Sequence, residues 1–324
     1  MVAVVVVRPS PSDPVAALEV RDEAPPPTTA PPSDWVPVTV RAAALNHHDV
    51  WSLRGVGLAA EKMPMVLGCD AAGVDPEGNE VVVHAVLSDP SWTGEETLDP
   101  KRSLLSEVYP GTFADTVLVP RRNLVPKPAE LTFEQAACLP TAWLTAYRML
   151  FTQAALRPGQ TVLVQGAGGG VATALVLLGS AAGLRVWVTS RDEGKRERAL
   201  DLGAAATFEP GARLPERVDA VMETVGEATW AHSLRSLRPG GTVVVSGATS
   251  GADPSADLQR VFFLQLRVLG STMGSRDELD RLLRFCATTG VRPLVDSVLP
   301  MTDAADAVER MVGGDLVGKL VLLP

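Results

Sequence analysis

Cysteine is scarce in this sequence, with three residues among 324. Cys69, Cys138 and Cys286 lie far apart along the chain, and none belongs to a Cys-x-x-Cys pair. No disulfide framework is therefore expected. This cysteine usage is typical of a protein from a reducing compartment.

Basic residues are outnumbered, because 29 Lys and Arg face 38 Asp and Glu and give a formal net charge of −9. That balance argues against nucleic acid or an anionic membrane surface as the main partner. No run of about 18 uncharged apolar residues occurs, so no membrane span is predicted. The apolar start, residues 2–7, is too short for a signal peptide and has no basic region before it. We therefore expect a cytoplasmic protein.

A glycine-rich stretch at residues 161–174 stands out against this background. Residues 162–164 are an unbroken apolar run, as in a parallel strand buried on both faces. The glycines that follow let the backbone approach a bulky anion, and the helix start beyond them offers unpaired N–H groups. The stretch predicts a dinucleotide site at the first strand–helix turn of a doubly wound sheet.

The chain changes character along its length. Short β segments predominate up to about residue 128, whereas strands alternate with helices from residue 159 to residue 272, as in parallel βαβ units. The last segments, from residue 294 onward, resemble the first half again. A chain of 324 residues with 46% hydrophobic content has room for two domains. We predict an α/β fold with a Rossmann domain at residues 129–290, inserted in a β-rich domain at residues 1–128 plus 291–324.

Several motifs together resemble the medium-chain dehydrogenase/reductase superfamily, nearest its zinc-free, quinone-oxidoreductase-like branch. They are residues 46–55, 67–74, 111–115, 131–147 and 165–174, and the ending Gly-Lys-Leu-Val-Leu-Leu-Pro at residues 318–324. The resemblance implies a GroES-like catalytic domain around the Rossmann domain, and a homodimer formed through the Rossmann sheet edge near residues 267–272. One departure is Ala172, which stands where family turns often end in glycine; alanine fits there because the position mainly needs close helix–strand packing.

The residues after the second Rossmann strand favour NADP(H) as cofactor. Ser190 and Arg191 follow the strand directly, and Lys195 comes one turn later. A hydroxyl, a guanidinium and an ammonium there suit a 2′-phosphate, whereas NAD needs a carboxylate at the strand end. Asp192 is expected in the first helical turn instead. The alternative is an ordinary solvated helix start.

The resemblance extends the cofactor site beyond these residues. It implies that Asn46 and Thr145 lie near the nicotinamide and its ribose, and that strand-end residues contact the carboxamide. The full set of predicted cofactor-binding residues is Asn46, Thr145, Ala167, Gly168, Gly169, Gly170, Val171, Ser190, Arg191, Lys195, Gly247, Thr249, Ser271 and Met273.

The positions that hold catalytic zinc in other members of the superfamily carry different residues. By resemblance, Asn46 stands at the cysteine position and Cys69-Asp70 at the histidine–glutamate pair. The four cysteines of a structural zinc site are absent, since residues 87–105 contain none. No metal ligand is predicted. The alternative left open is a partial site of Cys69 with His47 or His48.

The expected activity is metal-free hydride transfer from NADPH to a quinone or an α,β-unsaturated carbonyl compound, with a small apolar substrate. Conjugate reduction spreads charge into an enolate or hydroquinone and so asks less of the protein than reduction of a plain ketone. The predicted catalytic residues are Asn46, Trp51 and Asp70; Trp51 either stacks on a flat substrate or is plain core packing. Water, Asp49, Asp70 and His48 all remain possible proton donors.

Two other functions are compatible with the same fold. One is an alcohol or carbonyl dehydrogenase, with an unusual metal at Cys69. The other is a non-catalytic NADPH-binding protein, because Trp51 stands where quinone-reductase relatives often have tyrosine, and indole cannot serve as a proton acid.

Overall fold

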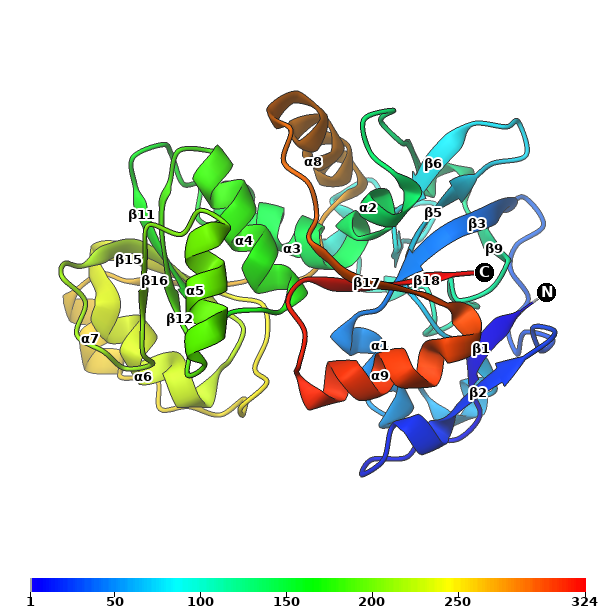
Figure 1. The fold of residues 1–324 in the computed structure, drawn as a ribbon, viewed down its shortest axis with the longest axis horizontal. Coiled ribbons are helices and arrows are strands. Elements are labelled where there is room, and N and C mark those ends of the chain that lie inside the picture. The colour runs from blue at the N-terminus through cyan, green and yellow to red at the C-terminus, as the bar shows by residue number, and fades with distance from the viewer. Residues whose placement is uncertain (1) are drawn as a thin grey trace. The chain divides into compact units, whose positions relative to one another are not determined.

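The computed structural model describes residues 2–324, which form two compact units (Figure 1). Unit 1 combines Met1–Leu144 with Met273–Pro324, and unit 2 is the segment Thr145–Thr272 between them. Unit 2 is thus narrower than the predicted Rossmann domain of residues 129–290. The difference arises because α2 (Phe133–Ala137) packs on the strands of unit 1, and α8 (Arg276–Thr289) contacts its strand β10 (Leu124–Pro126).

Unit 2 is built on a six-stranded sheet with the order β13-β12-β11-β14-β15-β16, all of it parallel. This is the strand order of a dinucleotide-binding doubly wound sheet, and it confirms the predicted fold class. The strands are β11 (Thr161–Gln165), β12 (Arg185–Thr189), β13 (Ala206–Phe208), β14 (Val218–Glu223), β15 (Leu237–Val245) and β16 (Arg267–Gly270).

Helices connect these strands. Figure 1 shows α4 and α5 side by side against one face of the sheet, where they contact β11, β12 and β13. The helices of unit 2 are α3 (Leu144–Tyr147, which begins in unit 1), α4 (Gly170–Ala181), α5 (Glu193–Asp201), α6 (Glu227–Ser236) and α7 (Leu258–Phe263).

Unit 1 is β-rich. Its main sheet has the order β10-β6-β5-β3-β18-β17, with β9 also paired to β3, and smaller sheets β2-β1-β4 and β7-β8 complete it. The strands are β1 (Ala3–Val6), β2 (Leu18–Arg21), β3 (Val36–Ala44), β4 (Met65–Val66), β5 (Asp70–Val74), β6 (Glu80–Val83), β7 (Val86–Leu87), β8 (Ser103–Leu104), β9 (Thr116–Val119), β17 (Val295–Pro300) and β18 (Lys319–Leu323). Helices α1 (His47–Leu53) and α9 (Ala304–Gly313) contact each other beside this sheet.

The last strand of the chain closes the sheet of the first half. Strand β18 pairs antiparallel with β3, with Val321 opposite Ala44, so the red and blue segments of Figure 1 lie side by side. Both strands are buried at this point, within a core that also includes Leu45, Leu320 and Leu322. Residues near 45 and near 319 therefore share one apolar surrounding.

The sequence predicts a strand at residues 15–20, a helix at residues 254–266, and a long helix up to residue 154 that is interrupted or kinked near Pro140. The first two differ from the structure, and the third agrees with it. The strand expected at residues 15–20 starts as a 3₁₀ turn, Val15–Ala17, before β2. The helix expected at residues 254–266 has six residues, since Asp257 caps α7 with a side-chain hydrogen bond to Arg260 N. The interruption predicted near Pro140 is present as a π-helical segment, Leu139–Trp143, and a second one, Arg148–Gln153, was not predicted.

No helix within residues 2–324 is long and apolar enough to cross a membrane.

Candidate active site

The predicted site residues fall into both units. Unit 1 contains Asn46, Trp51, Asp70 and Met273, and unit 2 contains the glycine turn and the other predicted cofactor residues.

Asn46 and Asp70 meet at the end of β3. This strand ends at Ala44, and β5 pairs with it so that Ala44 lies opposite Asp70. Asn46 comes two residues later, immediately before α1. Its side-chain Nδ2 donates to Asp70 Oδ2 at 2.8 Å, and both side chains are buried. The structure thus brings together two of the three predicted catalytic residues, while their roles stay predictions.

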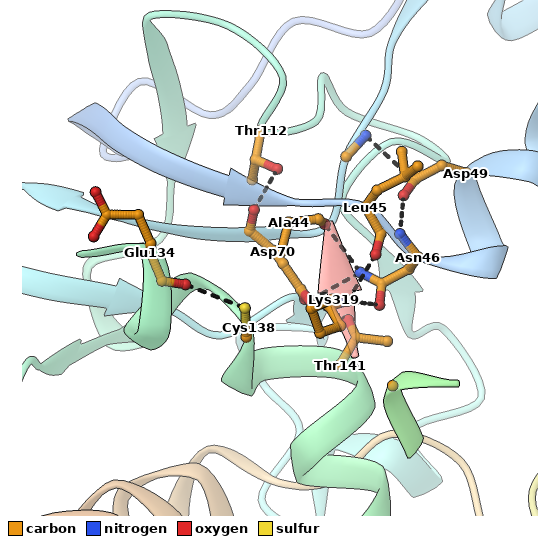
Figure 2. Close-up of polar contacts among 12 residues, drawn as sticks. Ala44, Leu45, Asn46, Asp49, Asp70, Thr112, Glu134, Cys138, Thr141 and Lys319 are labelled. Carbon is orange, nitrogen blue, oxygen red and sulfur yellow. Dashed lines mark hydrogen bonds and ion pairs between the residues drawn. The ribbon is translucent and has the colours of Figure 1, made fainter. Parts of the chain in front are cut away.

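A buried lysine that the sequence analysis did not single out lies beside this pair (Figure 2). Lys319 opens β18, and its Nζ donates to Asn46 Oδ1 at 2.5 Å and to Leu45 O at 2.7 Å. The same Nζ lies 3.4 Å from Asp70 Oδ2. An ammonium has three protons to donate, so these contacts occupy all of them. The available signal was a charged residue at the head of an apolar strand, because lysine is rarely buried without a partner.

Thr141 adds a hydroxyl to the same group. Its Oγ1 donates to Asp70 Oδ1 at 2.5 Å, so both carboxylate oxygens of Asp70 accept hydrogen bonds. We call Asn46, Asp70, Thr141 and Lys319 the Asp70 cluster. Burial raises the pKa of Asp70, and the Lys319 ammonium opposes that effect. Asp70 therefore binds a proton more readily than a surface aspartate would.

Asp49 accepts hydrogen bonds from two backbone N–H groups beside the cluster. Its Oδ2 accepts from Asn46 N at 2.8 Å, and its Oδ1 accepts from Gly68 N at 3.1 Å. Complete burial raises the pKa of Asp49 to about 6. Because each oxygen accepts a backbone N–H, Asp49 fixes the start of α1 relative to residues 68–70.

The two cysteines near the cluster, Cys69 and Cys138, have buried thiols that donate to backbone carbonyls. Cys69 Sγ donates to Leu105 O at 3.2 Å, and burial raises the pKa of this thiol well above its usual range, with the charges of Asp49 and Asp70 acting in the same direction. Cys138 Sγ donates to Glu134 O at 3.1 Å, as Figure 2 shows, and burial raises its pKa to about 12. With a raised pKa, neither thiol readily loses its proton, whereas a metal ion binds the thiolate form.

The donor set here does not fit a zinc ion. Zinc takes three or four convergent nitrogen, sulfur or carboxylate ligands. Asn46 Oδ1 and Asp70 Oδ2 instead face the Lys319 ammonium. In the part of the chain that the structure describes, no group of three His, Cys, Asp or Glu side chains could hold a metal ion.

Trp51, on α1, is not a member of the Asp70 cluster. Its side chain is 38% exposed, and the Arg54 guanidinium lies 5.3 Å from its ring centroid. Among the described residues, no hydrogen bond joins Trp51 to Asn46 or Asp70. A ring this exposed is not a core residue, and its contact with a flat substrate stays a prediction.

In unit 2, the glycine turn joins β11 to α4. Gly166 and Gly168 have φ angles of +85° and +89°, which favour glycine. Ala167 lies between them, and Gly169 is the N-cap of α4, which starts at Gly170 and Val171. No side chain within residues 2–324 caps this helix, so its first N–H groups are open to an anion. The turn fits a pyrophosphate.

The end of β12 carries the residues predicted to select the cofactor. Ser190 is buried, Arg191 is exposed, and Asp192 is the N-cap of α5, with its Oδ1 accepting from Lys195 N at 2.8 Å. The Asp192 carboxylate is thus used by the helix. Arg196, which sequence reasoning missed, donates from Nη1 to Ser190 O at 2.7 Å and adds a cation beside this strand end.

The remaining predicted cofactor residues of unit 2 include several at the carboxyl edge of the sheet. Gly247 and Thr249 follow β15 and pack on Thr224 O, at the end of the neighbouring strand. Ser271 follows β16, and its buried hydroxyl has no hydrogen-bond partner among the described residues. An orphaned hydroxyl at this edge fits a polar ligand group such as a carboxamide. Thr145 is buried in α3, whereas Met273, in unit 1, packs on Cys69 and Ala85.

Comparison with known proteins agrees with this architecture. Residues 32–129 match the family model of the alcohol dehydrogenase GroES-like domain, and residues 170–288 match that of zinc-binding dehydrogenases. An acryloyl-coenzyme A reductase of Metallosphaera sedula is 31% identical over 316 residues, which cover 90% of this chain and 93% of that protein.

Solved structures are similar over the whole chain. An NAD-dependent alcohol dehydrogenase matches with a TM-score of 0.90 and 34% identity and covers 100% of both chains. A 2-octenoyl-CoA carboxylase reductase in complex with NADP and 2-octenoyl-CoA matches with a TM-score of 0.90 and 25% identity, covering 99% of this chain and 87% of the other. The chain therefore belongs to the medium-chain dehydrogenase/reductase superfamily of oxidoreductases. The GroES-like character predicted for unit 1 is confirmed.

Proposed function

We propose that this protein is a metal-free, NADPH-dependent reductase of α,β-unsaturated carbonyl compounds or quinones. The observation that carries the proposal is the Asp70 cluster. At positions where zinc-dependent members place ligands, Asn46 Oδ1 and Asp70 Oδ2 are directed at the ammonium of Lys319. The Lys319 ammonium thus interacts with the oxygen atoms that a metal ion would need as ligands.

The chemistry follows from this donor set. Hydride addition to an isolated carbonyl puts the full charge on one oxygen, which calls for a Lewis acid or a strong proton donor. Hydride addition to the β-carbon of a conjugated system delocalises that charge, and an ordinary proton source then completes the reaction. NADPH supplies the hydride when bound. The acryloyl-coenzyme A reductase relative, whose named substrate is a conjugated thioester, supports this class of acceptor.

The proton source in this proposal is Asp70, acting through Thr141. Thr141 is the half-buried member of the cluster, and its hydroxyl donates to a carboxyl whose pKa is raised by burial. When Asp70 is protonated, its carboxyl O–H donates to Thr141 Oγ1, and the Thr141 hydroxyl proton is then free to point to a substrate or a water molecule. Transfer of that proton outward, with the Asp70 proton passing to Thr141, leaves Asp70 ionised. Asp49 is not suited to this role, because it is completely buried and its hydrogen-bond partners are the backbone N–H groups of Asn46 and Gly68, which cannot relay a proton.

Replacement of Thr141 tests the proton path. Thr141→Val should lower kcat by about 100-fold, the lower range for loss of a positioned acid, with KM little changed. Thr141→Ser keeps the hydroxyl and should retain most of the activity. The solvent isotope effect on kcat should rise in the valine variant, because proton delivery becomes slower. Equal kcat values for the valine and serine variants would remove Thr141 from the mechanism.

The preference for NADPH rests on Ser190, Arg191 and Arg196 at the end of β12. Arg191→Ala should weaken NADPH binding by about tenfold or more through loss of a charge-assisted contact to the 2′-phosphate, and should leave NADH binding nearly unchanged. Fluorescence titration with the two cofactors measures both. An equal effect on both cofactors would contradict the assignment.

The reaction itself is tested by NADPH oxidation with an enone, an enoyl thioester, a quinone and a saturated ketone. We expect turnover with at least one conjugated acceptor, none with the saturated ketone, and no loss of rate after treatment with a chelator. Stoichiometric zinc in the purified protein, together with inhibition by the chelator, would overturn the metal-free proposal.

A second candidate is an alcohol or carbonyl dehydrogenase, favoured by the full-length match at 34% identity to an NAD-dependent alcohol dehydrogenase. Oxidation of simple alcohols by NAD, with no reaction towards conjugated acceptors, would favour it. The same set of assays therefore separates the two functions.

A further inference from the structure

A cavity lies in unit 2, away from the glycine turn. It has a volume of about 460 Å³ and is lined by the loop at residues 211–217 and by one side of α6, including His232, Arg235 and Ser236. Arg217 directly precedes β14, and Ser236 is the last residue of α6. In a parallel sheet the start of a strand and the end of the helix that follows it lie at the amino edge. The glycine turn follows the carboxyl end of β11 and so lies at the opposite edge.

The charge of this cavity is unusual for the protein. Three arginines line it, Arg213, Arg217 and Arg235; all three are exposed, and their guanidinium groups make no hydrogen bond or ion pair with any described residue. The single acid in the lining, Glu216, pairs with Arg185. A chain with a net charge of −9 therefore gathers three unpaired guanidinium groups around one hollow.

We propose that this cavity, here called the arginine pocket, binds a small phosphate-bearing anion that acts as an effector of the protein. Guanidinium groups match phosphate oxygens with paired hydrogen bonds and cannot lose their charge at physiological pH. Ala212, Leu214 and Pro215 supply apolar surface for the carbon skeleton of a small metabolite. The pocket lies outside the set of residues predicted to bind the nicotinamide cofactor.

A continuous chain of hydrogen bonds joins the arginine pocket to the glycine turn. His232 Nε2 bonds to Ala212 O in the pocket loop at 2.9 Å, and His232 Nδ1 bonds to Gln165 Nε2 at 3.0 Å. Gln165 Oε1 accepts from Thr189 Oγ1 at 2.6 Å, and Thr189 Oγ1 accepts from Gly166 N at 3.4 Å. Gly166, the donor of the last of these hydrogen bonds, is the first residue of the glycine turn.

The protonation of His232 agrees with this path. The amide Nε2 of Gln165 can only donate, so His232 Nδ1 accepts and Nε2 carries the proton given to Ala212 O. Burial lowers the pKa of His232, which favours this neutral tautomer. A ligand that fixes the loop at residues 211–217 therefore also fixes Gln165 and the start of the turn. The turn then loses less freedom on binding a dinucleotide, which is positive coupling.

Hydrogen exchange with inorganic pyrophosphate as the probe tests the site. We expect protection of residues 209–217 in the full-length protein, and affinity for the probe lowered by about tenfold or more in R213Q/R235Q, as for loss of two charge-assisted contacts. The control R281Q/R284Q removes two exposed arginines from α8 in unit 1 and should bind as the wild type does. Because pyrophosphate can also enter the glycine turn, the titration is repeated with saturating NADPH. Unchanged binding in R213Q/R235Q would overturn the proposal.

The coupling is tested by the affinity for NADPH with and without pyrophosphate, and this part alone rests on the proposed function. We expect the probe to tighten NADPH binding by about fivefold in the wild type, the lower range of allosteric coupling. R213Q/R235Q should show only competition at the turn. Gln165→Met and, if that variant does not fold, Thr189→Val should bind the probe without the tightening, because both residues lie outside the pocket lining and each breaks the hydrogen-bond chain. A wild type that shows no tightening overturns the coupling, whereas failure to bind NADPH at all contradicts the proposed function and leaves the probe-binding result intact.

Discussion

At the scale of single residues, Lys319 decides the character of the candidate active site. It is 2% exposed and separated from Asp70 by 249 positions, yet its ammonium lies beside that carboxylate. Asn46 and Asp70 could be predicted as site residues by resemblance, because each lies in a stretch, residues 46–55 and 67–74, that resembles a motif of the superfamily. Lys319 could not be placed with them, because only the pairing of β18 with β3 brings it there.

Removal of the Lys319 charge should be costly. Lys319→Met leaves Asp70 buried without its cation, and we expect the free energy of unfolding to fall by about 3–5 kcal/mol. Chemical denaturation measures this change.

The matched control is the double variant Lys319→Met/Asp70→Asn, which removes both charges. It should be less destabilised than Lys319→Met alone, because no unpaired ion remains in the core. A double variant that shows the simple sum of the single effects would mean that the two side chains do not interact.

Asp49 should leave a signature in the pH dependence of stability. Its pKa is about 6 in the folded protein, above its ordinary value, so between pH 4 and 6 the folded state binds more protons than the unfolded state. Stability therefore falls as the pH rises through this window, and Asp70, whose pKa is also raised, adds to the slope with the same sign.

Asp49→Asn should flatten this slope and also lower stability by about 1–3 kcal/mol, because an amide can accept only one of the two backbone N–H groups. Denaturation curves at pH 4, 5, 6 and 7 measure both effects. A slope in the variant equal to that of the wild type would show that Asp49 does not titrate in this range.

At the scale of elements, the sequence predicted the strand–turn–helix at residues 161–174 because each part carries its own local signal. Apolar β-branched residues form β11, glycines form the turn, and the open helix start follows. Thr132 with Gln135 three residues later is a capping-box pattern, and in the structure Gln135 N donates to Thr132 Oγ1. The helix interruption at Pro140 could also be predicted, whereas the second π-helical segment, Arg148–Gln153, contains no proline and was missed.

Two substitutions test the register of the glycine turn. Gly168→Ala places a side chain at a φ of +89°, where it costs about 1–2 kcal/mol. The turn should adjust, and NADPH affinity should fall by about tenfold or more. Ala172→Gly changes a position that needs only a small side chain, and affinity should change by less than about tenfold. Calorimetric titration measures both, and the reverse order of effects would mean that the turn is wrongly assigned.

At the scale of the whole molecule, the sequence predicted an inserted parallel sheet and a β-rich surround, and the strand orders agree. The limits of the units could not be predicted, because α2 and α8 differ from other helices only in the strands that they contact. Contacts between side chains that are far apart in the sequence, such as Lys319 and Asp70, could not be predicted either, because they too depend on which elements pack together.

We propose that two copies pair through the edge of the unit 2 sheet. Strand β16 is the last strand on that side, Val268 on it is 46% exposed, and Phe262 and Phe263 of α7 are 70% and 76% exposed. A charge on an edge strand opposes pairing. Val268→Arg should therefore produce a monomer in light scattering, whereas the control Val312→Arg, on α9 of unit 1, should leave a dimer. A wild-type protein that is monomeric would refute the pairing.

The insertion of unit 2 also sets the order in which the chain can mature on the ribosome. Unit 2 is one uninterrupted segment, Thr145–Thr272, and all of its strands are synthesised before β17 and β18. Its sheet can therefore close while unit 1 still lacks two strands. Until Lys319 emerges, the nascent chain holds Asp70 without the cation that later neutralises it. The β-rich unit therefore receives β17, β18 and the Lys319 ammonium only after unit 2 has been synthesised.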